Sequence, residues 1–112
     1  MEKIVYINSE FLGTGSDELG KILIRNFLLT LADSGDRINA FFLVNSGVKL
    51  ACEGSHVLDV LKKISEAGTL IYSCGTCLDY FGLKSALVCG AAGNMKMLAA
   101  GLSDEKNHVI RP

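Results

Sequence analysis

Residues 69–82 read TLIYSCGTCLDYFG, and this stretch passes directly from a strand pattern to a helix pattern. The segment Thr69–Ser73 is short and mostly apolar, and Ala67-Gly68 precedes it, which is typical of a buried β-strand. A short helix is expected from about Leu78 to Ser85. A strand that leads straight into a helix is characteristic of parallel sheets, because parallel strands need a crossover connection.

The same alternation of strand and helix continues along the chain. Further strands are expected at residues 3–8 (KIVYIN), 38–44 (INAFFLV), 86–89 (ALVC) and 108–111, and further helices at about 16–33, 56–67 and 95–102. Ser16 is the expected N-cap of the first helix, and residues 48–55 are expected to form a loop. Apolar strands that alternate with helices predict an α/β fold of three layers, α/β/α, around a mainly parallel sheet of about five strands.

Composition limits the classes of partner. The 112 residues fit one domain, 1–112, and their net charge is −1 with no basic cluster, so nucleic acid is not expected as a partner. Neither an apolar run of about 18 residues nor a secretory signal is visible, so we expect a cytoplasmic protein without membrane contact. Because 49% of so short a chain is hydrophobic, we also expect a homo-oligomer.

Two cysteines lie where an open parallel sheet carries its chemistry, at the carboxyl ends of the strands. Cys74 follows the third predicted strand, and Cys77 lies at or near the start of the next helix, whose dipole favours a thiolate. Lys49, after the second strand, is a candidate basic neighbour. Asn45 and Asn94 follow the second and fourth strands as candidate hydrogen-bond donors, although turn formation is the more common role for both.

The C-x-x-C spacing alone leaves several kinds of site open. A thioredoxin-type pair is excluded, because that fold faces its cysteines with a cis-proline and Pro112 is the chain's one proline. A zinc site would need Cys52 and Cys89 as well, and Cys89 lies in an apolar run that predicts a core position. The glycine-rich segment GTGSDELG lacks the spacing of a nucleotide-binding loop, and its two acids would repel phosphate. We therefore expect neither a metal nor another cofactor.

Four stretches together resemble a known family. They are NSEFLGTGSDELG, FFLVNSGVKLACEGS, SCGTCLDYFGL and the late GNM, and in this order they cover nearly the whole chain. They are similar to the DsrE-like domain of YedF-type selenium-metabolism proteins, within the DsrE/DsrF/TusD sulfur-relay superfamily. YedF-type proteins usually carry an additional TusA-like N-terminal domain with a Cys-Pro motif, which these residues do not contain. We therefore expect either a standalone version or part of a longer protein.

The resemblance implies a parallel α/β/α domain that assembles into dimers, trimers or hexamers. It also implies a cysteine after the third strand that carries sulfur as a persulfide, and Cys74 falls on that position. Cys77 matches the YedF-type subgroup, where it would resolve or shield the persulfide. A TusA-like sulfur carrier or a cysteine desulfurase is the implied partner.

The sequence thus leads to a ranked set of hypotheses. The first is a sulfurtransferase-like carrier of sulfur, or alternatively of selenium, that holds sulfane sulfur on Cys74 and passes it to a partner thiol. Backbone N–H groups around Gly75 to Leu78, those of Gly75 and Thr76 included, would stabilise the thiolate. The second is a non-enzymatic oligomeric binding or regulatory module with a redox-sensitive Cys74–Cys77 disulfide. The third is a zinc-stabilised domain.

Overall fold

A five-stranded sheet with the strand order β4-β3-β2-β1-β5 organises the molecule, and every neighbouring pair in it is parallel. The structure, a computed structural model, describes residues 2–112. The strands are β1 (Lys3–Ile7), β2 (Ala40–Leu43), β3 (Leu70–Cys74), β4 (Ala91–Gly93) and β5 (His108–Ile110). The predicted parallel sheet is therefore confirmed.

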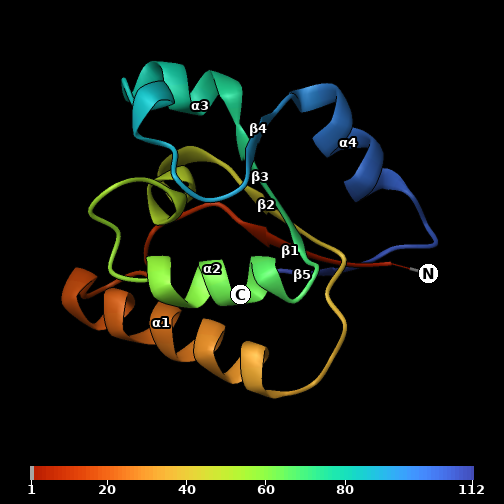
Figure 1. Cartoon of the computed structure of the whole chain (residues 1–112), viewed down its shortest axis with the longest axis horizontal. Coiled ribbons are helices and arrows are strands. Elements are labelled where there is room, and N and C mark those ends of the chain that lie inside the picture. Colours follow the sequence, from red (N-terminus) through yellow and green to blue (C-terminus); the bar gives the residue numbers. More distant parts are fainter. Residues whose placement is uncertain (1) are drawn as a thin grey trace.

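Helices cover both faces of this sheet (Figure 1). The helices α1 (Asp17–Asp33) and α2 (Leu58–Glu66) lie on one side, and α3 (Gly75–Tyr80) and α4 (Met95–Ser103) lie on the other. Val5, Phe41 and Ile71 are aligned across the three central strands and are almost fully buried. All four residues of β2, which point alternately to the two faces, are buried as well. Burial on both faces is why the central strands read as continuous apolar runs. The predicted three-layer α/β/α architecture is confirmed.

Helix α1 forms where the sequence predicts it. The Oγ atom of Ser16 accepts a hydrogen bond from the N–H of Leu19 at 3.1 Å, which confirms Ser16 as the N-cap. Gly20, Ile24 and Leu28 recur every four residues and form the buried face of the helix. No helix within residues 2–112 is long and apolar enough to cross a lipid bilayer.

The expected loop at residues 48–55 is wrong in its first half, because residues 48–51 belong to a buried 3₁₀-helix, η1 (Asn45–Ala51). Val48, Leu50 and Ala51 are at most 1% exposed and belong to the core. Gly47 lies directly against the backbone of β1, where a Cβ atom would come within 2.6 Å of the Ile7 carbonyl oxygen. Close backbone contact and apolar burial therefore hold η1 over the carboxyl end of the sheet.

The strand expected at residues 86–89 is also wrong. Residue 86 ends a short 3₁₀-helix, η2 (Lys84–Ala86). The N–H groups of Val88 and Cys89 both donate to the carbonyl oxygen of Ala51. This segment therefore pairs with the end of η1, and β4 begins only after Gly90. The neighbouring helix α3 begins at Gly75, earlier than expected, and ends at Tyr80.

We predict that Gly90→Ala destabilises the fold far more than Gly82→Ala. Both glycines have positive φ angles, +78° and +67°, so alanine costs about 1–2 kcal/mol of left-handed strain at either position. At Gly90 a Cβ atom would also overlap the carbonyl oxygen of Ile71, whereas at Gly82 the space is open. Urea unfolding followed by circular dichroism measures both free energies of unfolding, and equal losses would contradict the role of this close approach.

Candidate functional site

The two cysteines of the C-x-x-C motif lie together at the carboxyl end of β3. Cys74 is the last residue of this strand and the N-cap of α3, and Cys77 is three residues further, in the first helical turn. Side chains at this spacing share one side of a helix start. Both are free thiols; Cys74 is buried, at 8% exposure, and Cys77 is partly exposed. The pair is therefore one buried and one accessible thiol.

Asn45 joins this pair from the neighbouring strand connection. It begins η1 directly after β2, and its backbone N–H donates to the Sγ atom of Cys77, with 3.1 Å between nitrogen and sulfur. Its φ angle is +50°, in the left-handed region that few residues other than glycine adopt. The Oδ1 atom of Asn45 accepts from the N–H of Ser46 at 2.8 Å, which supports this conformation. Asn45 thus contacts the thiol through its backbone N–H and not through its side chain.

The electrostatics of Cys77 differ from the sequence-based expectation. Burial raises the pKa of the Cys77 thiol above its ordinary value of 9.0, and the neighbouring Cys74 thiol raises it further. The hydrogen bond from Asn45 lowers the pKa of Cys77, but this effect is smaller than that of burial. The expected lowering of the pKa by the helix start is therefore wrong, because the cost of removing a thiolate from water is larger.

The two thiols open onto different spaces. Cys77 lines a cavity of about 500 Å³ together with Asn45, Thr76, Tyr80 and Phe81. Tyr80 is 84% exposed, and its ring meets that of Phe81 edge-on, with 5.3 Å between the ring centres. Two aromatic residues therefore form the outer wall beside Cys77. Their spacing from Cys77, three and four residues along a helix, is a signal that the sequence analysis missed.

Cys74 adjoins a much smaller space. This cavity of about 10 Å³ is bordered by β3, by Gly93 and Asn94, and by the start of α4. The Oδ1 atom of Asn94 accepts from the N–H of Met97 at 2.8 Å and caps α4, so this candidate donor serves as a helix cap. A Cβ atom on Gly75 would lie 3.2 Å from the carbonyl oxygen of Gly93, so glycine lets α3 start close to β4.

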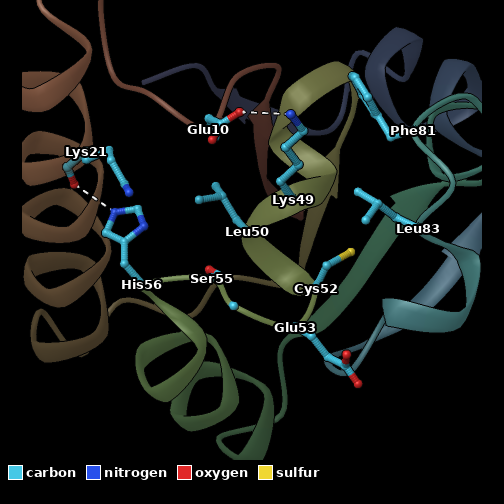
Figure 2. Close-up of a pocket in the computed structure, with 11 residues that line it drawn as sticks. Glu10, Lys21, Lys49, Leu50, Cys52, Glu53, Ser55, His56, Phe81 and Leu83 are labelled. Carbon is cyan, nitrogen blue, oxygen red and sulfur yellow. Dashed lines mark hydrogen bonds and ion pairs between the residues drawn. The ribbon is translucent and has the colours of Figure 1, made fainter.

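Lys49 lies in a second cavity, of about 430 Å³, beside the first (Figure 2). Its Nζ atom is 3.5 Å from Oε2 of Glu10 and 4.7 Å from the ring centre of Phe81. Phe81 lines both cavities and separates them. The ammonium group is thus held by a carboxylate and an aromatic face. The structure places Lys49 beside Phe81, in the neighbouring cavity, and not among the groups that set the pKa of Cys77.

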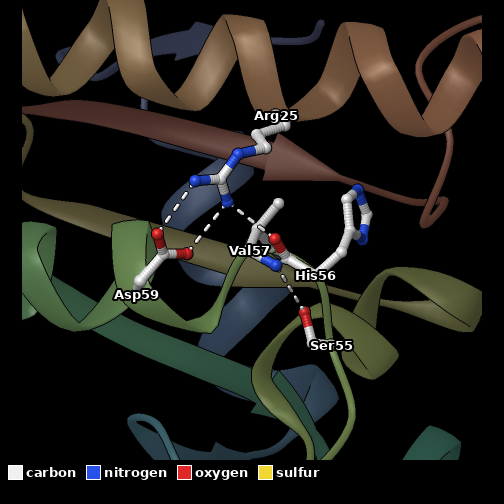
Figure 3. Close-up of polar contacts among 5 residues, drawn as sticks. All are labelled: Arg25, Ser55, His56, Val57 and Asp59. Carbon is white, nitrogen blue, oxygen red and sulfur yellow. Dashed lines mark hydrogen bonds and ion pairs between the residues drawn. The ribbon is translucent and has the colours of Figure 1, made fainter.

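The far wall of this second cavity is held by a network between α1 and α2 (Figures 2 and 3). Arg25 donates to the backbone oxygen of His56 at 2.7 Å and forms two hydrogen bonds of 2.9 Å with the carboxylate of Asp59. These hydrogen bonds hold the pKa of Asp59 well below its usual range. The Nε2 atom of His56 lies 2.9 Å from the carbonyl oxygen of Lys21. His56 therefore links α1 to the segment before α2.

The other two cysteines lie away from the C-x-x-C pair, although Cys52 borders the second cavity. Cys52 and Cys89 are buried in the core, which confirms the core position predicted for Cys89. Burial raises the pKa of both thiols. Among residues 2–112, no three side chains of the types His, Cys, Asp and Glu come together as a metal-binding group.

We predict that Asn45→Gly is nearly neutral for stability, whereas Asn45→Ala costs about 1 kcal/mol or more, because alanine is strained at a φ of +50°. Both variants keep the N–H that donates to Cys77. The free energy of unfolding in urea gives the comparison, and equal stability of the two variants would contradict a left-handed backbone at this position.

We also predict that the alkylation rate of Cys77 by iodoacetamide keeps rising with pH beyond the ordinary thiol value of 9.0, because the thiolate is the reactive form and its pKa is raised. Cys74→Ala removes one of the causes, so the midpoint of this profile should move to lower pH. Peptide mapping by mass spectrometry reads Cys77 separately from the other cysteines. A midpoint that stays in place would show that the two thiols do not interact.

Comparison with known proteins supports the fold. No model of a known protein family matches the chain, and no curated protein matches it in sequence. Among solved structures, MTH1491 of Methanobacterium thermoautotrophicum, a protein of unknown function, has a TM-score of 0.72 at 15% identity and covers 100% of both chains. YchN of E. coli has a TM-score of 0.69 at 21% identity, over 98% of this chain and 100% of its own. BT1422 of Bacteroides thetaiotaomicron, a conserved protein of unknown function, has a TM-score of 0.67 at 16% identity, over 99% and 95%. The chain therefore has the DsrE-like α/β fold of YchN.

Proposed function

We propose that this protein is a carrier of sulfane sulfur that uses the Cys74–Cys77 pair. The observation that carries the proposal is the pair itself: two free thiols at the carboxyl end of a central parallel strand, one of which opens onto a cavity of about 500 Å³. In open α/β sheets this edge is where ligands and chemistry are found. Cys74 would hold the sulfur and yield it to a partner thiol.

The reaction needs no external oxidant or reductant. A thiolate attacks the outer sulfur of a donor persulfide, a new S–S bond forms on the cysteine, and the donor's S–S bond breaks to release its thiolate. The same exchange in the opposite sense delivers the sulfur to an acceptor. A raised pKa at Cys77 keeps most of this thiol protonated at neutral pH.

The finer assignment follows the sequence resemblance. We propose that the protein is closest to the DsrE-like domains of YedF-type proteins, which would add selenium as an alternative cargo. A TusA-like carrier or a cysteine desulfurase is the proposed sulfur donor. The proposed assembly is a homo-oligomer, and the exposed Leu19 and Ile22 on α1, each 52% exposed, are apolar surface that such an assembly could cover.

The decisive test is intact mass under non-reducing conditions after incubation with a cysteine desulfurase and cysteine. We expect the wild type to gain one sulfur atom that reductant removes. After the donor is removed and free glutathione is added, Cys74→Ser should lose this sulfur much faster than the wild type, because the buried storage thiol is gone. Cys89→Ala is the matched control, since it removes a buried thiol outside the site, and it should load like the wild type.

Other outcomes point elsewhere. Sulfur that is retained unchanged by Cys74→Ser would contradict the carrier role of this residue. A wild type that gains no sulfur and loses only two hydrogens would instead favour the redox module with a Cys74–Cys77 disulfide. The closeness of the two thiols is the observation that makes this second function a competitor.

A further inference from the structure

Access to the two thiols is unequal. Cys77 is partly exposed and lines the cavity of about 500 Å³, which is wide enough for a small thiol compound or an extended peptide. Cys74 is 8% exposed and adjoins the cavity of about 10 Å³. That smaller volume is about the space of one water molecule. A donor persulfide therefore meets Cys77 first, and no comparable opening leads to Cys74.

The hydrogen bond from Asn45 distinguishes Cys77 from Cys74. The N–H of Asn45 donates to the Sγ atom of Cys77. Hydrogen bonds to a charged acceptor are roughly twice as strong as neutral ones, so this contact stabilises Cys77 most when it is a thiolate. A thiolate forms at Cys77 at two moments: when it attacks, and when it leaves from a persulfide.

We propose that the pair works as an inward relay, in which Cys77 is the entry thiol and Cys74 is the storage thiol. This inference rests on the proposed carrier function and assigns an order within it. First, the Cys77 thiolate attacks the terminal sulfur of the donor persulfide; the S–S bond forms on Cys77, the donor S–S bond breaks, and the donor thiolate takes up the proton that Cys77 lost.

In the second step Cys74 loses its proton and attacks the terminal sulfur of the Cys77 persulfide. The S–S bond on Cys77 breaks, and Cys77 leaves as a thiolate beside the N–H of Asn45 before it takes back a proton. The oxidation states of all sulfur atoms balance across both steps, and no co-reactant is consumed. The sulfane sulfur then sits on the buried thiol, next to a space of single-atom size.

Burial at Cys74 gives the stored sulfur a protection that Cys77 lacks. Thiol exchange requires access of the attacking thiolate to the sulfur. A competing small thiol reaches the large cavity but has no comparable route to Cys74. Sulfur on Cys77 is therefore labile, and sulfur on Cys74 is retained until Cys77 carries it out again.

The test uses glutathione persulfide as the donor, acid quenching at successive times, and peptide mass spectrometry to place the added sulfur. In the wild type we expect sulfur on Cys77 early and on Cys74 late. Cys74→Ser should load at the wild-type rate on Cys77 but lose the sulfur to free glutathione about tenfold faster or more. Cys77→Ser should load Cys74 about tenfold more slowly or worse, because the entry thiol is missing.

Two controls keep the result interpretable. Cys77→Ala repeats the entry test without a hydroxyl group, and circular dichroism confirms that each variant is folded. Loading of Cys74 at the wild-type rate in both Cys77 variants would overturn the relay and leave the carrier function standing. Release of hydrosulfide with a Cys74–Cys77 disulfide would overturn the storage role of Cys74. No added sulfur on any protein would overturn the carrier function itself.

Discussion

The close approach of η1 to the end of β1 is the contact on which the site depends. Gly47 lies so near the Ile7 carbonyl that any side chain would displace it, and the buried Val48 and Leu50 fix the rest of the segment in the core. This holds the chain across the carboxyl edge of the sheet instead of letting it run into solvent. As a result Asn45 reaches Cys77 and Lys49 reaches Phe81, two contacts that join segments more than thirty residues apart.

Burial and hydrogen bonding compete at this edge, and their balance decides how the thiols behave. A helix start contributes about 0.3–1 kcal/mol toward a thiolate, which is less than one pKa unit at about 1.4 kcal/mol per unit. At Cys77 burial is the largest effect, and burial and the neighbouring Cys74 thiol together outweigh the Asn45 hydrogen bond, so the pKa of Cys77 is raised. The Cys77 thiol is therefore not a permanently ionised nucleophile at neutral pH.

The sequence predicts the parts of the fold that depend on local pattern. Residues 4–7 (IVYI) and 40–44 (AFFLV) are hydrophobic at consecutive positions, so these strands require cover on both faces, and the parallel sheet follows. Residues 48–55 and 86–89 were not predictable in this way, because backbone contacts with Ile7 and Ala51 determine their conformations. The position of Cys74 and Cys77 at the carboxyl edge followed from chain order. Their unequal burial did not, since it depends on how α4 and η1 pack around them.

The fold of this protein does not determine its chemistry. One α/β architecture can host unrelated functions, so the similarity to YchN and its structural relatives describes the scaffold and leaves the reaction to the site. Within the site, the aromatic Phe81 divides the large cavity beside Cys77 from the charged one beside Lys49. Lys49 contacts both Glu10 and the Phe81 ring, so the charged cavity and the cavity beside Cys77 share one aromatic residue.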